Sequence, residues 1–145
     1  MPIHLQWLDE PNQQDCIDLD KLYADAPESW AVNSVCDSGS EWALGQLGLG
    51  ALVALGRFND RIVCAACVIR QSDVSTQPYL YDVKQVCVRS ITRERGVAKQ
   101  LLVRLCQWAD DTTSSLFITD EAGKLASLYE LGFTQYLTGW RYLPR

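Results

Sequence analysis

The feature that most constrains the fold is the stretch Val86–Val103, where the hydrophobic pattern changes its period. The apolar run Val83, Val86, Cys87 and Val88 is typical of a strand, and the residues after it have helical spacing. One side of that helix is expected to be buried, with Val97, Leu101, Leu105 and Trp108 along its centre and Ala98, Leu102 and Ala109 beside them. The stretch therefore predicts a strand, a short turn and an amphipathic helix in immediate succession.

The turn between this strand and helix has the composition of an anion site. Residues 89–95 are mostly polar and basic, and the helix opens with the pattern R-x-x-G-x-A, formed by Arg93, Gly96 and Ala98. The first N–H groups of a helix have no partner inside it, and the helix dipole favours negative charge there. Because small residues let an anion approach this backbone closely, the sequence predicts a diphosphate site at the junction.

Two common nucleotide motifs fit the junction poorly. A Walker loop needs a longer glycine-rich run ending in Gly-Lys-Ser/Thr, which the sequence lacks. A dinucleotide fold needs three glycines near the N-terminus, whereas this junction holds one and lies beyond mid-chain. The junction instead resembles the pyrophosphate loop of the GNAT acetyltransferase superfamily, which has R/Q-x-x-G-x-G/A after a strand. Leu128–Phe133 resembles part of the last helix of the same superfamily, in the expected order.

This resemblance implies a fold class and a cofactor. We expect one GNAT domain over residues 1–145, an α+β fold in which helices flank a central, mixed and mostly antiparallel sheet. In the superfamily two central strands separate, and the pantetheine arm of acetyl-CoA or CoA lies between them. By resemblance, the strand backbone would hold the pantetheine and the junction the pyrophosphate. The residues so implicated are Val86, Cys87, Val88, Arg93, Glu94, Arg95, Gly96, Val97, Ala98 and Lys99.

Acetyl transfer would require two further groups. The attacking amine must lose a proton and the departing thiolate must gain one. Tyr129 occupies the place at which the superfamily often keeps a phenol that protonates the sulfur, and a core tyrosine is the alternative interpretation. Asp82 is a candidate base, with Asp120 and Glu121 as alternatives, and the asparagine usual early in the last helix is absent.

A closer resemblance extends over nearly the whole chain. Its blocks are Gln14–Lys21, Arg57–Arg61, Val88–Val97, Leu131–Thr134 and Gly139-Trp140. They resemble the PanZ (or PanM) family of CoA-binding, GNAT-fold factors, which promote self-cleavage of pro-aspartate decarboxylase. This implies an acetyl-CoA sensor that docks on aspartate 1-decarboxylase. The chain is longer than that family around Ser38–Gly50, which bears on the docking surface.

A working N-acetyltransferase is the alternative to a regulatory factor. It would move acetyl from acetyl-CoA to an amine of a small molecule or a protein. Tyr129 favours this alternative, because the PanZ pattern lacks a tyrosine at that place. A GNAT-like fold that has lost its ligand is disfavoured, because the R-x-x-G-x-A pattern is intact.

Composition excludes several other classes. The net charge of −5 over 145 residues argues against a nucleic-acid groove, and no apolar run is long enough for a membrane helix. The six cysteines lie in expected helices and strands, so we expect reduced thiols and a cytoplasmic protein. We also expect a monomer or weak dimer. Cys64 and Cys67 have metal-like spacing, but no second Cys/His pair completes a site, so we expect no metal. His4, the sole histidine, is expected to be structural.

The remaining elements follow from period and turn signals. We expect a first strand over Ile3–Leu8, a helix capped by Asn12 and ended by Pro27, and a short helix with loops over Glu28–Gly50. Asn59-Asp60 predicts a tight hairpin between strands Ala51–Phe58 and Arg61–Ile69. The later expectations are strands Tyr79–Val88 and Ser115–Thr119, a helix Glu121–Leu131 stopped by Gly132, and a strand pair Phe133–Tyr136 and Trp140–Tyr142.

Overall fold

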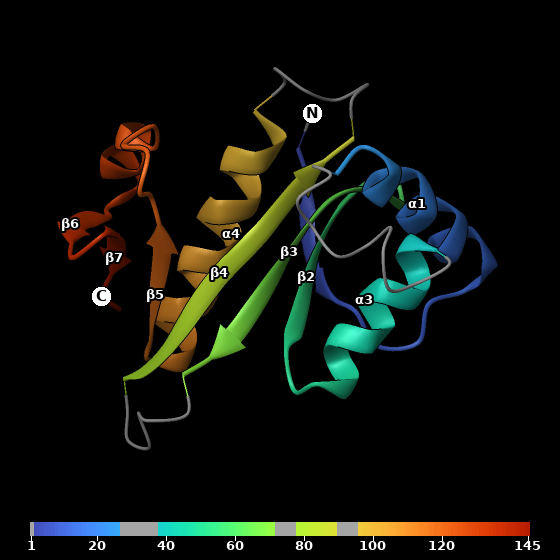
Figure 1. Cartoon of the computed structure of the whole chain (residues 1–145), viewed down its shortest axis with the longest axis horizontal. Coiled ribbons are helices and arrows are strands. Elements are labelled where there is room, and N and C mark those ends of the chain that lie inside the picture. The colour runs from blue at the N-terminus through green and yellow to red at the C-terminus, as the bar shows by residue number, and fades with distance from the viewer. Residues whose placement is uncertain (1, 27–37, 72–77, 90–95) are drawn as a thin grey trace.

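The computed structural model describes residues 2–26, 38–71, 78–89 and 96–145 (Figure 1). The helices are α1 (Gln13–Ala24), α3 (Gly39–Gly48) and α4 (Val97–Thr112), with a 3₁₀ turn η2 (Ala126–Leu131). The strands are β1 (His4–Trp7), β2 (Leu52–Phe58), β3 (Arg61–Arg70), β4 (Tyr79–Val88), β5 (Ser114–Thr119), β6 (Thr134–Tyr136) and β7 (Gly139–Tyr142). No helix in these ranges is long and apolar enough to cross a membrane.

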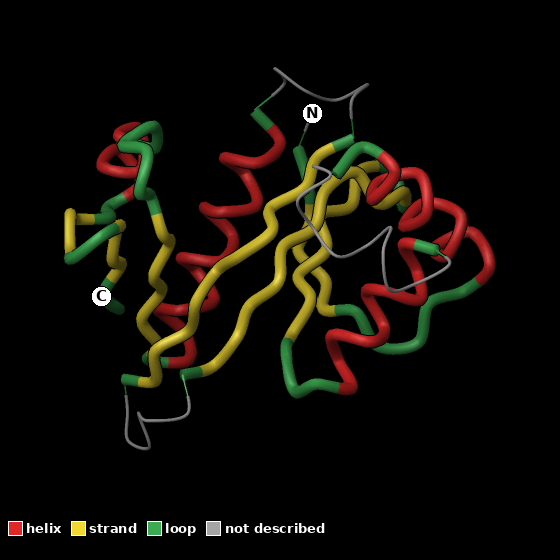
Figure 2. The backbone as a smooth tube through the Cα atoms, in the orientation of Figure 1, coloured by secondary structure: helices red, strands yellow, loops and turns green. Residues whose placement is uncertain are grey.

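The strands form one seven-stranded sheet in the order β1-β2-β3-β4-β5-β7-β6. Every neighbouring pair is antiparallel except β4 and β5, which are parallel and joined through α4 (Figure 2). This confirms the expected α+β fold with a mixed, mostly antiparallel sheet. The tight hairpin is also confirmed, because Asn59 and Asp60 both adopt the positive φ angles, 50° and 65°, that a two-residue turn of this kind requires.

Helices cover both faces of the sheet, and each face has its own core. α4 packs on one face through Val97, Leu101 and Leu105, as its spacing predicts. α1 and α3 pack on the other face, over β2 and β3 (Figure 1). Cys64 belongs to the α4 core and Cys67 to the α1/α3 core, so the two thiols point to opposite faces and cannot share a metal.

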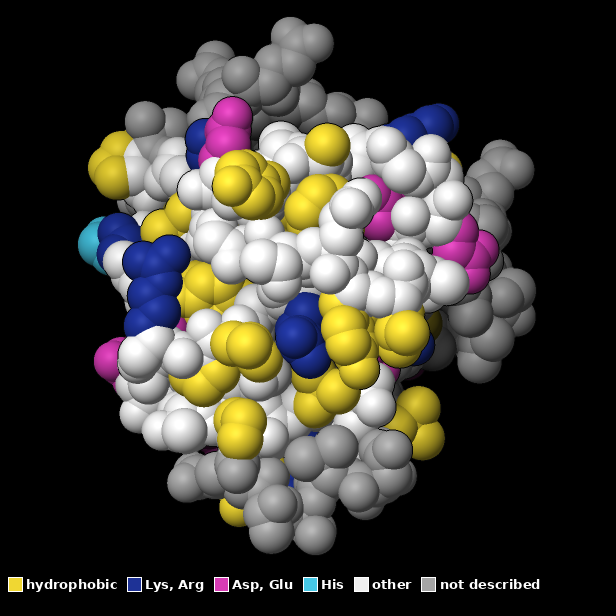
Figure 3. Space-filling view, turned by 90° about the vertical axis from the view of Figure 1, so that its left-hand side faces the viewer, with side chains coloured by type: hydrophobic (Ala, Val, Ile, Leu, Met, Phe, Trp, Pro, Cys, Tyr) yellow, Lys and Arg dark blue, Asp and Glu magenta, His cyan; other side chains and the backbone are white. Residues whose placement is uncertain are grey.

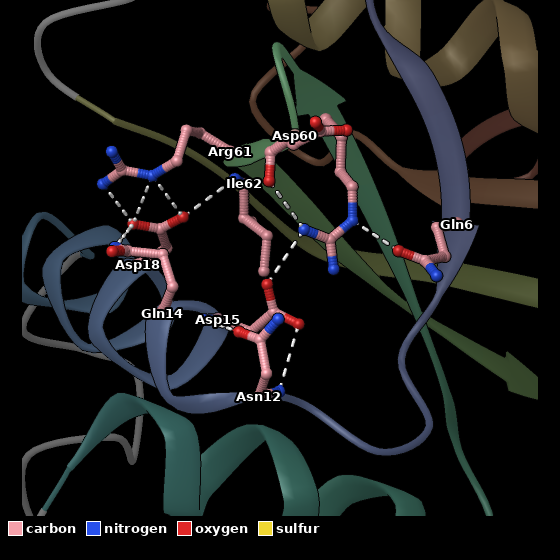
Figure 4. A network of polar contacts seen from close by, with 9 residues as sticks. Gln6, Asn12, Gln14, Asp15, Asp18, Asp60, Arg61 and Ile62 are labelled. Carbon is pink, nitrogen blue, oxygen red and sulfur yellow. Dashed lines mark hydrogen bonds and ion pairs between the residues drawn. The ribbon is translucent and has the colours of Figure 1, made fainter.

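Two charged pairs hold α1 against the β2–β3 hairpin (Figure 4). Asp18 is fully buried and accepts hydrogen bonds from the Arg61 guanidinium, at 2.6 Å from Nη2, and from the Ile62 N–H, at 3.1 Å. Burial alone would raise the pKa of Asp18, but the bonds from Arg61, Ile62 and Gln14 outweigh it and lower the pKa. Asp15 accepts from Arg57 at 2.9 Å and completes the capping box with Asn12 that the sequence predicts.

The segment before Gly132 is not the helix that the sequence predicts. Only Ala126–Leu131 is helical, as the 3₁₀ turn η2, and residues 121–125 form a turn and an irregular stretch, so the expected helix over Glu121–Leu131 is wrong. The Asp120 carboxylate accepts hydrogen bonds from the N–H groups of Lys124 and Leu125, which fixes an irregular loop instead. Gly132 ends the turn with φ 99°, as predicted.

The short helix expected before β2 is α3, and it tolerates three glycines. α3 runs for ten residues and contains Gly39, Gly45 and Gly48. Ser38 caps it by accepting from the Glu41 N–H at 3.2 Å, and a side chain on Gly39 would lie 2.8 Å from the Tyr23 Cβ. The expected short helix is therefore confirmed, and Gly39 serves the close approach of α3 to α1. Pro27, expected to end α1, lies outside the described residues.

Candidate functional site

The strands β4 and β5 separate partway along their length. They pair over four positions, from Tyr79 opposite Ser114 to Asp82 opposite Phe117. Beyond Asp82, β4 continues to Val88 in register with β3, whereas Ile118 and Thr119 of β5 pair with β7. Figure 1 shows the two strands diverging toward the end of β4, with α4 behind the gap. We refer to the region beyond Asp82, where β4 and β5 are no longer paired, as the β4–β5 gap.

A bulge at Gln85 sets the direction of the last residues of β4. Ala65 pairs with Cys87 and Cys67 with Lys84, so Gln85 and Val86 together lie opposite Ala66. Gln85 has φ 55°, which is rare for a residue other than glycine. The extra residue reverses the alternation, so that Val83, Val86 and Val88 face the α4 core and Cys87 faces the α1/α3 core.

The backbone groups of Val86 and Val88 point into the β4–β5 gap. Arg89 N–H donates to the Val63 carbonyl on β3, and alternation along an antiparallel ladder turns Cys87 the same way. Val86 and Val88 therefore present their N–H and C=O groups on the other side, toward β5. The Cys87 thiol is buried and donates to the Leu22 carbonyl at 3.3 Å, so Cys87 is the least suited of the three predicted residues to touch a ligand.

The first turn of α4 lies at the far end of β4, where the gap is widest (Figure 1). Gly96 caps this helix with φ 70° and no side-chain hydrogen bond, and a Cβ added there would have no atom within 4 Å. The Val97 side chain is buried in the core. Its backbone N–H belongs to the first turn of the helix, where N–H groups have no partner inside the helix. Gly96, Val97, Ala98 and Lys99 are thus together at one helix start, while Arg93, Glu94 and Arg95 lie outside the described residues.

The two predicted catalytic residues occupy different places. Asp82 lies at the last rung before the strands separate, and its Oδ1 accepts from Gln71 Nε2 at 2.8 Å. Tyr129 lies on η2 with 71% of its surface exposed, so the alternative of a core tyrosine is wrong, and its neighbour Leu128 fills that role. Lys99 and Glu130 approach to 3.7 Å, which places η2 beside the first turn of α4.

Sequence reasoning missed Gln85 and Gln71. Gln85 carries the bulge, yet glutamine is no signal for positive φ, and the run Val83–Val88 has the composition of an ordinary strand. Gln71 holds the Asp82 carboxylate from the end of β3, a contact that only the β3–β4 register creates. His4 is exposed on β1, far from the gap in the sheet order.

The fold is that of the GNAT acetyltransferases. YhhK of E. coli, solved in solution bound to coenzyme A, superposes with a TM-score of 0.59 at 24% identity over 99% of both chains. YncA of Salmonella typhimurium, solved with its cofactor acetyl-CoA, superposes with a TM-score of 0.65 at 17% identity, over 100% of this chain and 95% of that one. YhbS of E. coli, a GNAT protein in complex with CoA, gives 0.68 at 11% identity, over 98% and 81%.

The chain also matches a more specific family within this class. The model of the family described as acetyltransferase (GNAT) domain, PanZ, matches residues 2–138, and the chain belongs to that family. The closer resemblance seen in the sequence blocks is thereby confirmed. A comparison with curated protein sequences finds no match.

Proposed function

We propose that this protein binds acetyl-CoA or CoA, with the pantetheine in the β4–β5 gap and the pyrophosphate at the start of α4. The observation that carries the proposal is the separation of β4 from β5 beyond Asp82, which turns Val86 and Val88 toward an open edge. Gly96 supports the second half, since an anion can approach a helix start that carries no side chain. Solved relatives of the same fold bind CoA or acetyl-CoA.

We further propose a regulatory role of the PanZ type. In this role the CoA-bound protein docks on the precursor of aspartate 1-decarboxylase in the cytoplasm and promotes its self-cleavage. Membership of the PanZ family supports this assignment. α3 lies in the segment that the sequence comparison predicts to be longer than in the family, so its exposed side, which includes Leu44, is the part of the docking surface expected to differ.

N-acetyltransferase activity is the second candidate function. Its support is the exposed side chain of Tyr129 on η2, beside the first turn of α4, and the Tyr129 hydroxyl is the proposed proton donor to the departing thiolate. Asp82 is the proposed base, directly or through a water, because it stands where the gap begins. The oxyanion of the tetrahedral intermediate would accept from the Val88 N–H.

One set of measurements separates these roles. Calorimetric titration with acetyl-CoA is expected to show one site, and amide exchange of bound protein should slow at Val86 and Val88 but not at Cys87, which already faces β3. Pro-aspartate decarboxylase is then incubated with the protein, with and without acetyl-CoA. Acetyl-CoA-dependent cleavage supports the regulatory role, and no change in cleavage rate contradicts it. CoA release with amine acceptors that Tyr129→Phe reduces at least tenfold would support the enzyme instead.

Absence of any heat or exchange change with acetyl-CoA would contradict the ligand proposal as a whole. Exchange protection that appears at Cys87 rather than at Val86 and Val88 would contradict the placement in the gap. The two results are distinct, because the first concerns affinity and the second concerns which edge of β4 the ligand meets.

A further inference from the structure

One half of the sheet face opposite α4 has no helix over it in the described part of the chain. α1 and α3 pack over β2 and β3 at the other end of this face (Figure 1). Phe117 and Arg141 lie opposite one another on β5 and β7, and their sequence neighbours Leu116, Ile118, Trp140 and Tyr142 fill the α4 core. Alternation therefore places Phe117 and Arg141 on the uncovered face.

Aromatic side chains surround Arg141 on this face. Its guanidinium carbon lies 4.1 Å from the centre of the Tyr136 ring, and the Tyr136 and Phe117 rings meet edge to face at 6.4 Å. Tyr136 is 40% exposed and Leu137, at the tip of the β6–β7 turn, is 84% exposed. Phe117, Tyr136, Leu137 and Arg141 together form what we call the Arg141 face, and Figure 3 shows apolar and basic side chains intermixed on that side of the molecule.

Arg141 lacks an acceptor among the described residues. Its Nε atom is buried without a hydrogen bond, and it takes part in none of the ion pairs found in these ranges. The nearest carboxylate in the same row across the sheet, Asp82, is two strands away and accepts from Gln71. A guanidinium that is stacked on an aromatic ring, with its Nε buried and unpaired, is a strong partner for a carboxylate, because an acceptor would satisfy a donor that now has none.

We propose that the Arg141 face docks a segment of a partner polypeptide that presents a glutamate or aspartate between apolar side chains. The carboxylate pairs with the Arg141 guanidinium, and the flanking apolar side chains cover Phe117, Tyr136 and Leu137. Arginine and tyrosine surrounded by apolar contacts are the composition of protein-binding hot spots. The proposal rests on charge complementarity at a single arginine and does not depend on CoA binding.

The test uses two blocked peptides that differ in one group, acetyl-Leu-Glu-Leu-amide and acetyl-Leu-Gln-Leu-amide. Each is titrated into ¹⁵N-labelled full-length protein and followed by NMR. We expect the glutamate peptide to shift the Arg141 Nε–H and the amides of Tyr136 and Leu137, and to bind about fivefold or more tightly than the glutamine peptide, because charge-assisted hydrogen bonds are the stronger ones.

Two variants and one control locate the effect. Arg141→Met should remove the preference for glutamate. Thr134→Glu should block the peptide, because Thr134 lies directly across from Arg141 and an internal carboxylate there would pair with it. Arg70→Met is the matched control, since Arg70 stacks on Tyr79 at 4.0 Å on another part of the sheet and should leave binding unchanged.

Three outcomes would overturn the proposal. One is equal affinity for the two peptides, including no binding of either, and another is a set of shifts confined to other residues. The third is self-association, measured by sedimentation, that Arg141→Met abolishes and the glutamate peptide fails to displace, because a second copy of the chain would then be the occupant.

Discussion

At the scale of single residues, Gly96 makes the sharpest prediction. Gly96→Glu should lower acetyl-CoA affinity at least tenfold, because it puts a negative charge and bulk where the pyrophosphate is proposed to bind. Gly50→Glu is the matched control, since Gly50 also has positive φ, 91°, and open space at its Cβ, but lies between α3 and β2. Calorimetric titration of both variants measures the difference, and equal loss of affinity in the two would refute the site.

Gln85 supports a prediction about stability. Gln85→Val should lower the free energy of unfolding by about 1–2 kcal/mol, because a β-branched residue is disfavoured at positive φ. Lys84→Val, at the neighbouring exposed strand position, should change it by about 0.5 kcal/mol or less. Urea unfolding of both variants is the measurement. If Gln85→Val is as stable as the wild type, the bulge does not lie at residue 85.

Gly96, Gln85 and Tyr129 show which features of single residues could be predicted from the sequence. Gly96 is visible in the sequence, because a lone glycine before a helical pattern marks its start. The bulge at Gln85 is not visible, since it arises when β4 pairs with both β3 and, further back, β5. Tyr129 was expected on a helix, but it lies on the 3₁₀ turn η2 with its side chain exposed, after the loop that Asp120 fixes.

At the scale of elements, α1 depends on its buried carboxylate. Asp18→Asn should lower the free energy of unfolding at pH 7 by about 2–3 kcal/mol, because Arg61 and the Ile62 N–H lose a charged acceptor. Asp9→Asn, an exposed aspartate before α1, is the control and should have little effect. Chemical unfolding at fixed pH gives both values, and a loss below 0.5 kcal/mol for Asp18→Asn would be contrary to the structure.

The same carboxylate gives a pH dependence with a definite sign. The pKa of Asp18 is lower in the folded protein than its ordinary value of 3.8, so Asp18 stabilises the fold fully above that value. This contribution is lost as the pH falls through the folded-state pKa. The stability difference between wild type and Asp18→Asn should therefore be constant from pH 7 to about pH 5 and shrink below about pH 4. A difference that grows on acidification would have the wrong sign.

Elements with a clear period were predicted well, and irregular ones were not. β4 and the Asn59-Asp60 hairpin have the predicted bounds to within a residue, because alternation and turn residues are local signals. The helix predicted for residues 121–125 does not form, because the Asp120 carboxylate accepts a backbone N–H from this segment. The position of Asp120 is fixed by β5, which it follows, and by its hydrogen bond from Trp140. The expected fold was correct, since the sequence motifs identify the family more strongly than any local pattern.

At the scale of the whole molecule, the buried thiols report on cooperativity. Burial raises the pKa values of Cys64, Cys67 and Cys106 to about 12, so they should resist iodoacetamide at pH 8 in the native protein. In rising urea all three should become reactive together, although Cys67 lies in the α1/α3 core and the other two in the α4 core. Peptide mass mapping follows each site, and reaction of Cys67 at a clearly different urea concentration would show two independently unfolding layers.

The short parallel seam between β4 and β5 has a mechanical consequence. In the described part of the chain, four residue pairs join the β1–β4 half of the sheet to the β5–β7 half, and α4 contacts both halves. A nucleotide bound between the two halves would contact both and restrict their relative movement. Its binding and release would therefore change the surfaces on either side of the seam.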